Sequence, residues 1–176
     1  MSEKYKIYPE GLFFITLTVV GWIDVFTREE YAEEIIDNLN FCIEKKGLKI
    51  YSFCIISSHV HMIASSSNFS LSDILRDFKS YTAKKIIASI EGNPRESRKE
   101  WMLHMFEFYA KGNSHNSKYQ FWQQHNHPID LVSNKFVDEK RQYIHENPVK
   151  AKLVNEACNY IYSSANPFTR LKLEAL

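Results

Sequence analysis

Residues 51–63 read Tyr-Ser-Phe-Cys-Ile-Ile-Ser-Ser-His-Val-His-Met-Ile and predict two β-strands joined by a short turn. The apolar run from Tyr51 to Ile56 has strand composition, and the apolar character resumes after Ser57-Ser58. Such close coupling favours an antiparallel hairpin. Alternate side chains of a strand share a face, so His59 and His61 should point the same way, with Cα atoms roughly 6–7 Å apart.

Two neutral imidazoles on one strand could form half of a divalent-metal site. Taken alone, such a pair is more often two surface histidines on a half-exposed sheet, because two ligands rarely hold a metal. A metal site therefore requires a further ligand from elsewhere in the chain, together with a group that performs chemistry.

The flanking sequence predicts a strand, a helix, this hairpin, more helices and a short closing sheet segment. Helix starts are indicated by a capping box at Thr27 to Glu30, by Ser70 and by Asn134. The last helix should end near Asn147, because the residue before a proline disfavours the α conformation. The expected elements are strands at 12–20, 48–57, 59–65, 119–123 and 129–132, and helices at 27–47, 70–90, 96–110 and 134–147.

This order of elements predicts an α+β fold of the ferredoxin-like, split βαβ type. The sheet should be mainly antiparallel with helices packed against it. We expect residues 1–176 to form one domain, because no linker, repeat or low-complexity tract divides the chain.

The composition excludes several classes of protein. A net charge of +1 rules out a strongly basic, histone-like protein, although a local basic patch can still bind nucleic acid. The three scattered cysteines suggest a reducing, cytoplasmic location and no disulfide framework. No apolar run is long enough to cross a bilayer, so no membrane partner is expected.

A second motif, Tyr143-Ile-His-Glu-Asn147-Pro148, lies far from the histidines in sequence. Positions i and i+4 of a helix lie on one face, so Tyr143 and Asn147 should project together. The amide oxygen of Asn147 suits a hard cation, and the helix C-terminus adds negative dipole character. Each residue alone is as compatible with an ordinary packing or helix-end role.

Together these motifs resemble the REP-associated tyrosine transposases, the single-tyrosine branch of the HUH nucleases. The resemblance rests on His59-Val60-His61 and on residues 143–151, Tyr-Ile-His-Glu-Asn-Pro-Val-Lys-Ala. Phe121-Trp122-Gln123 and the closing Tyr-Ser-Ser-Ala at 162–165 add to it, and the match spans about residues 8 to 168.

The resemblance implies an HUH-type tyrosine transposase that cleaves and rejoins single-stranded DNA near DNA hairpins. His59, His61 and Asn147 would hold one divalent ion, Mg²⁺ or Mn²⁺. Tyr143 would attack the scissile phosphate and form a 5′-phosphotyrosine bond. The neighbouring His145 and Glu146 should turn away from Tyr143, so no general base is assigned.

Several residues are predicted to contact DNA. Basic side chains for phosphates and ring side chains for bases supply this set: Lys79, Lys84, Arg95, Arg98, Trp122 and His125. The turn at residues 123–127 lacks the acidic residue usual in the family, so substrate selection there is left open. The sequence leaves open both a monomer and a homodimer, and both a cis and a trans tyrosine.

Two other enzymes and one binding protein are alternatives to a transposase. A histidine-triad hydrolase needs a third alternating histidine, but position 63 is Ile. A zinc hydrolase would have to recruit His125 or His127 without a recognisable spacing. The non-enzymatic alternative is a DNA-hairpin-binding protein that keeps the fold but no longer transposes.

Overall fold

The computed structural model describes residues 7–67, 69–112 and 118–175. Four strands form one antiparallel sheet in the order β2-β3-β1-β4. Because β3 lies between β1 and β2, the β1-α1-β2 unit is a split βαβ, as predicted. The strands are β1 (Phe13–Thr18), β2 (Leu48–Ile56), β3 (His59–Ser66) and β4 (Ile129–Asp130).

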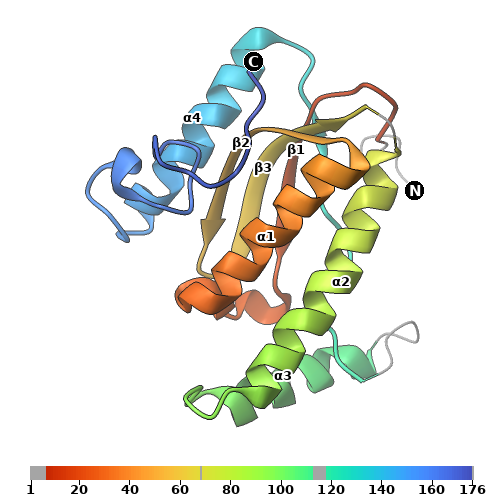
Figure 1. Cartoon of the computed structure of the whole chain (residues 1–176), viewed down its shortest axis with the longest axis vertical. Coiled ribbons are helices and arrows are strands. Elements are labelled where there is room, and N and C mark those ends of the chain that lie inside the picture. The colour runs from red at the N-terminus through yellow and green to blue at the C-terminus, as the bar shows by residue number, and fades with distance from the viewer. Residues whose placement is uncertain (1–6, 68, 113–117, 176) are drawn as a thin grey trace.

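Helices cover both faces of the sheet (Figure 1). Alternate residues of each strand form two apolar clusters, the larger with α1 and α2 and the smaller with α4. The helices are α1 (Glu29–Lys46), α2 (Leu71–Gly92), α3 (Lys99–Lys111) and α4 (Asn134–Lys150), with short 3-10 turns η2 (Val20–Trp22), η3 (Val25–Thr27) and η4 (Ala157–Asn159). No helix in the described ranges is long and apolar enough to cross a lipid bilayer.

The histidine hairpin forms as predicted. Ser57 and Ser58 make the turn between β2 and β3, and the β1–β3 register pairs Thr16 with His61 and Thr18 with His59. Residues on the same face as His61 include Phe14 of β1 and Ile63, which lie in the cluster that packs against α4. The histidine face of the sheet is therefore the α4 face.

The predicted strand at Tyr119–Gln123 is wrong. Within this segment pairing is limited to a single bridge between Trp122 and Val19. The Gln120 N–H donates instead to the Phe106 carbonyl of α3. The segment therefore joins the sheet edge through only two backbone hydrogen bonds among the described residues, Val20 N–H to the Phe121 carbonyl and Gln123 N–H to the Thr18 carbonyl.

The predicted start of the first helix is also wrong, because the Thr27 hydroxyl donates to the Asp24 carbonyl within η3 at 2.8 Å. The helix α1 begins after Arg28, and no side chain caps it. Glu30, the other half of the expected capping box, accepts instead from the Asn93 side chain at 2.6 Å.

Both predicted ends of the last helix need correction. The N-cap of α4 is Ser133, whose side chain accepts from the Phe136 N–H, so Asn134 is already inside the helix. The helix continues to Lys150 with Pro148 inside it. A proline removes only its own N–H bond, and the Ala151 N–H still reaches the Asn147 carbonyl at 2.9 Å.

The corrected N-cap gives a stability prediction. Ser133→Ala should lower the free energy of unfolding by about 1 kcal/mol, because one N–H of the first turn loses its acceptor. Asn134→Ala is the matched control and should change it by less than about 0.5 kcal/mol. Urea denaturation followed by circular dichroism measures both, and an equal loss in the two variants would contradict the cap assignment.

Candidate metal and tyrosine site

The strand β3 holds His59 and His61 side by side on the α4 face of the sheet. Their ring centroids are 4.6 Å apart. His61 is 5% exposed, whereas His59 at the strand start is half-buried. Because both sit on a paired central strand, their positions are fixed by the backbone ladder.

Each imidazole is oriented by a neighbouring hydroxyl. The Thr16 Oγ1 lies 2.9 Å from His61 Nδ1, and the Ser58 Oγ lies 3.1 Å from His59 Nδ1. The buried His61 Nε2 has no hydrogen-bond partner among the described residues. An Nδ1–H that donates to a hydroxyl leaves the Nε2 lone pair available, which is the arrangement that metal-binding histidines adopt. Neither Thr16 nor Ser58 stands out in the sequence.

The surroundings keep both rings neutral. Burial, followed by the nearby His59 and Lys140, lowers the pKa of His61 to about 3. Burial also lowers the pKa of His59. A neutral imidazole is the form that ligates a metal, so the electrostatics agree with the hydrogen bonding.

Tyr143 of α4 meets the histidine pair within one chain. Its ring centroid is 5.3 Å from that of His61 and 5.9 Å from that of Phe14, both edge-to-face. The side chain of Tyr143 is 41% exposed, in contrast to the buried Ile144 beside it. The tyrosine is thus packed against the histidines and remains open to a large substrate.

Asn147 lies one turn after Tyr143 on α4 and is half-buried. Its side chain makes no hydrogen bond within the described part of the chain, so its amide oxygen is uncommitted. The residues that the structure describes contain no group of three His, Cys, Asp or Glu side chains that could hold a metal. Asn147 offers an amide oxygen, a type of ligand outside those four.

One cation stands beside the tyrosine without a carboxylate partner among the described residues. The Lys140 Nζ lies 4.9 Å from the ring centroid of Phe14, 5.4 Å from Phe136 and 5.7 Å from Tyr143. Three ring faces attract the ammonium but leave its charge uncompensated. Lys150 also lies 5.8 Å from the Tyr143 ring, but it is paired with Glu146.

The histidine pair and the tyrosine lie within a segment that matches a known protein family. Residues 23–147 match the family model described as "Transposase IS200 like". The chain belongs to the IS200-like transposase family. Its members are DNA transposases, and the match includes the histidine pair, Tyr143 and Asn147.

The fold is shared with a solved structure. The structure of a REP-associated tyrosine transposase bound to a REP hairpin is similar, with a TM-score of 0.64, 16% identity, and coverage of 93% of this chain and 82% of that one. A candidate transposase from Deinococcus radiodurans R1 gives a TM-score of 0.45 and 18% identity, covering 82% of this chain and 96% of that one. Comparison with curated proteins gave no match.

In this IS200-like chain, His145 and Glu146 have contacts away from the tyrosine. His145 Nε2 lies 2.9 Å from Ser164 Oγ and 3.3 Å from Ser52 Oγ, so it ties α4 to the C-terminal tail and to β2. Glu146 accepts from Gln142 and pairs with Lys150. Both side chains are therefore engaged by partners other than Tyr143.

Two of the residues predicted to contact DNA have partners within the protein. Lys79 donates to the carbonyls of Gln123 and Gln124 and to the Asn126 side chain, at 2.6, 3.2 and 2.8 Å. These acceptors use all three of its N–H groups, although burial lowers its pKa to about 8. Trp122 is buried, and its indole N–H bonds to Thr82 at 3.0 Å.

Of the other residues predicted to contact DNA, one is ion-paired within the protein and three are exposed. Arg98 bonds to Asp24 at 2.7 Å and lies 3.5 Å from the buried Glu96, so its charge is already paired. This pairing also accounts for Arg98 standing directly before α3, where a cation opposes the helix dipole. Lys84, Arg95 and His125 are exposed.

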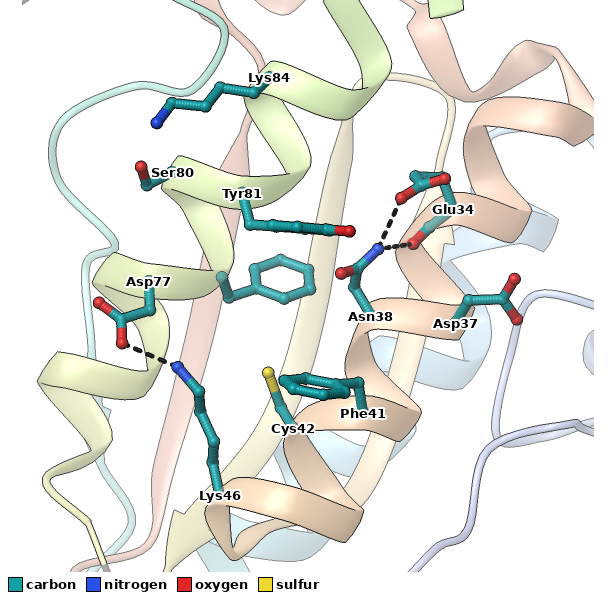
Figure 2. Close-up of a pocket in the computed structure, with 11 residues that line it drawn as sticks. Glu34, Asp37, Asn38, Phe41, Cys42, Lys46, Asp77, Ser80, Tyr81 and Lys84 are labelled. Carbon is teal, nitrogen blue, oxygen red and sulfur yellow. Dashed lines mark hydrogen bonds and ion pairs between the residues drawn. The ribbon is translucent and has the colours of Figure 1, made fainter.

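A groove lies between α1 and α2, over the larger apolar cluster and thus away from the histidine face (Figure 2). Its volume is about 640 Å³, and its polar ends are occupied by internal contacts, Lys46 with Asp77 and Asn38 with Glu34. Of the predicted site residues only Lys84 reaches it. The groove therefore takes no part in the metal and tyrosine site.

The internal role of Lys79 is testable. Lys79→Met should lower the free energy of unfolding by about 2 kcal/mol, because carbonyl and amide acceptors lose a charged donor. The exposed Lys84→Met on the same helix is the control, with a change below about 0.5 kcal/mol. Urea denaturation compares them, and a Lys79→Met variant as stable as the control would restore Lys79 as a free surface cation.

Proposed function

We propose that the protein is a metal-dependent single-stranded DNA endonuclease and strand transferase that acts through a 5′-phosphotyrosine intermediate near DNA hairpins. The observation that carries the proposal is the ring contact between the half-exposed Tyr143 and His61, whose buried Nε2 has no partner in the described structure. An uncommitted imidazole nitrogen beside an accessible tyrosine supplies both a ligand and a nucleophile.

His59, His61 and the amide of Asn147 would hold the ion. The unpartnered His61 Nε2 and the two hydroxyl-bonded Nδ1 atoms fit that role. A mixed set of nitrogen and oxygen ligands suits Mn²⁺ or Mg²⁺ and leaves positions for phosphate oxygens. When bound, the ion would polarise the scissile phosphate as a Lewis acid.

Tyr143 would act as the nucleophile. Its Oη forms a bond to the scissile phosphorus while the bond from phosphorus to the 3′-oxygen breaks, and the departing 3′-oxygen takes up a proton as the phenol loses one. The products are a 5′-phosphotyrosine and a free 3′-hydroxyl. Attack by another 3′-hydroxyl on the phosphotyrosine reverses the step and joins strands without ATP.

Lys140 would supply positive charge where the reaction gathers negative charge. The three rings around it place its Nζ beside the tyrosine, and no carboxylate of the described residues neutralises it. A preorganised cation is worth more in such a partly desolvated site than in water. Its partner in the reaction would be the scissile phosphate.

We also propose that Tyr143 acts in cis, since its contact with His61 lies within one chain. A DNA hairpin is proposed as the partner, because the similar REP-associated transposase was solved bound to one. The exposed Lys84, Arg95 and His125 are the remaining predicted residues that could meet its backbone or bases.

The nucleophile assignment predicts the fate of a covalent adduct. With Mg²⁺ and single-stranded DNA that carries the genomic flanking hairpins, the wild-type protein should give a denaturation-resistant adduct, visible as a shifted band on a denaturing gel. Tyr143→Phe should give none and still bind the hairpins, because only the hydroxyl is removed. Tyr81→Phe, at an exposed tyrosine on α2, is the control and should retain the adduct.

Undiminished adduct in Tyr143→Phe would refute the nucleophile. Hairpin binding without an adduct in the wild-type protein would favour the non-enzymatic alternative.

The hydroxyl that orients His61 predicts a metal effect. Thr16→Val should raise the Mn²⁺ concentration for half-maximal adduct formation about 10- to 100-fold, because His61 loses its Nδ1 partner. Saturating Mn²⁺ should restore most of the adduct. Thr18→Val, two residues along β1, removes a hydroxyl not bonded to either histidine and serves as control. An unchanged metal requirement in Thr16→Val would count against His61 as a ligand.

A further inference from the structure

The turn after β1 has an unusual backbone. Gly21 and Trp22 both have positive φ angles, 60° and 56°. Glycine adopts this left-handed region readily, whereas a bulky side chain does so at a cost in energy. Two consecutive left-handed residues, the second a tryptophan, therefore need support from the surrounding structure.

The support comes from both sides of the turn. The Val20 N–H bonds to the Phe121 carbonyl at 2.8 Å, and Val20 and Ile23 are buried. A Cβ atom at Gly21 would come within 2.8 Å of the Tyr109 ring of α3, so glycine suits the left-handed backbone and also lets the turn lie close to α3. The turn is thus held tightly between the core and α3.

The result of this arrangement is an exposed indole beside the metal ligands. Trp22 is 61% exposed, and its ring centroid is 5.2 Å from that of His59 at an interplanar angle of 78°. Trp122 of the same chain shows the ordinary role of a tryptophan, with a buried ring and a bonded indole N–H. Neither core packing nor turn chemistry explains why the strained position carries a large aromatic side chain.

We propose that Trp22 is a stacking platform for one nucleobase of the single-stranded DNA next to the scissile phosphate. This inference rests on the proposed function. A phosphate bound at the histidine pair brings its adjoining nucleotides to the neighbourhood of His59, where the indole is the exposed flat surface. Base–aromatic stacking tolerates any base, so the platform would position the strand without reading its sequence.

The geometry favours an unpaired base over duplex DNA. In a duplex both faces of each base are covered by its neighbours, whereas an unstacked base has a free face to lie against an indole. The platform is rigid because its backbone is held on both sides, so little freedom is lost when a base binds.

The test measures equilibrium binding in a Tyr143→Phe background, so that no covalent step intervenes. Trp22→Ala should weaken binding of a single-stranded oligonucleotide that spans the cleavage site about 5- to 150-fold, and Trp22→Phe should recover most of the loss. Trp101→Ala removes another exposed tryptophan, on α3, and should leave binding unchanged. Binding of an isolated hairpin should be the same in all variants.

An abasic scan of the oligonucleotide locates the stacked base. One abasic position flanking the scissile phosphate should weaken binding in the parent by a factor similar to Trp22→Ala, and should have no further effect in Trp22→Ala. Equal effects of each abasic position in both proteins would overturn the platform.

Folding stability separates stacking from a structural role. Trp22→Gly relieves the left-handed backbone, so its midpoint of urea denaturation should equal or exceed that of the parent while oligonucleotide binding falls. A lower midpoint, with parallel loss of hairpin binding, would show that the indole supports the fold and would overturn the inference. Absence of a covalent adduct in the wild-type protein would refute the cleavage mechanism. The stacking platform would still be decided by the oligonucleotide-binding measurements alone.

Discussion

The register between β1 and β3 is the constraint on which the site depends. It sets Thr16 opposite His61 and Thr18 opposite His59, which gives His61 its hydroxyl partner and turns both imidazoles toward α4. A slip of one residue would move both histidines into the larger apolar cluster and turn Val60 and Met62 toward α4. Because two imidazoles buried in the larger cluster would lose their polar partners, the hydrophobic core favours the observed register.

The tyrosine depends on a second set of contacts, those that fix α4 against the same face. Ile144 is buried in the smaller cluster, and His145 bonds to Ser52 of β2 and Ser164 of the tail. The tail in turn pairs with the outer edge of β2, where the Ile55 N–H meets the Tyr162 carbonyl. The motif at 143–147 therefore combines two tasks: its middle residues anchor the helix, and Tyr143 contacts His61 while remaining open to the solvent.

Much of this arrangement follows from local sequence pattern. The apolar runs around Ser57-Ser58 predicted the hairpin, strand alternation predicted that His59 and His61 share a face, and helical spacing placed Tyr143 and Asn147 together. The order of elements predicted the α+β split βαβ fold, which the structure confirms. These features depend on residues close in sequence, where the periodicities of strand and helix are sufficient.

The features that escaped prediction depend on contacts between distant segments. Lys79 resembles a surface cation until the 123–126 segment closes over it and supplies acceptors. Arg98 looks available until Asp24 and Glu96 are placed beside it. Thr16, Ser58 and Lys140 gain their roles at the site only once β1, β3 and α4 are assembled, and no spacing in the sequence marks them.

The distribution of charge and exposure distinguishes the site from the scaffold that holds it. Elsewhere in the described chain, the Lys79 ammonium has all its N–H groups hydrogen-bonded to neutral acceptors, and Arg98 and the buried Glu96 are ion-paired, as folding requires of groups removed from water. At the site the pattern is reversed: among the described residues His61 Nε2 lacks a partner and Lys140 lacks a counter-ion, and Trp22 lies exposed on a strained turn. Each of these is unfavourable for the protein alone, and an anionic strand with unstacked bases, together with a divalent ion, would satisfy all three. Trp22 lies beside His59 and Lys140 lies beside Tyr143, so these unrelated deficits surround the same group of residues and support the proposal that the DNA chemistry takes place there.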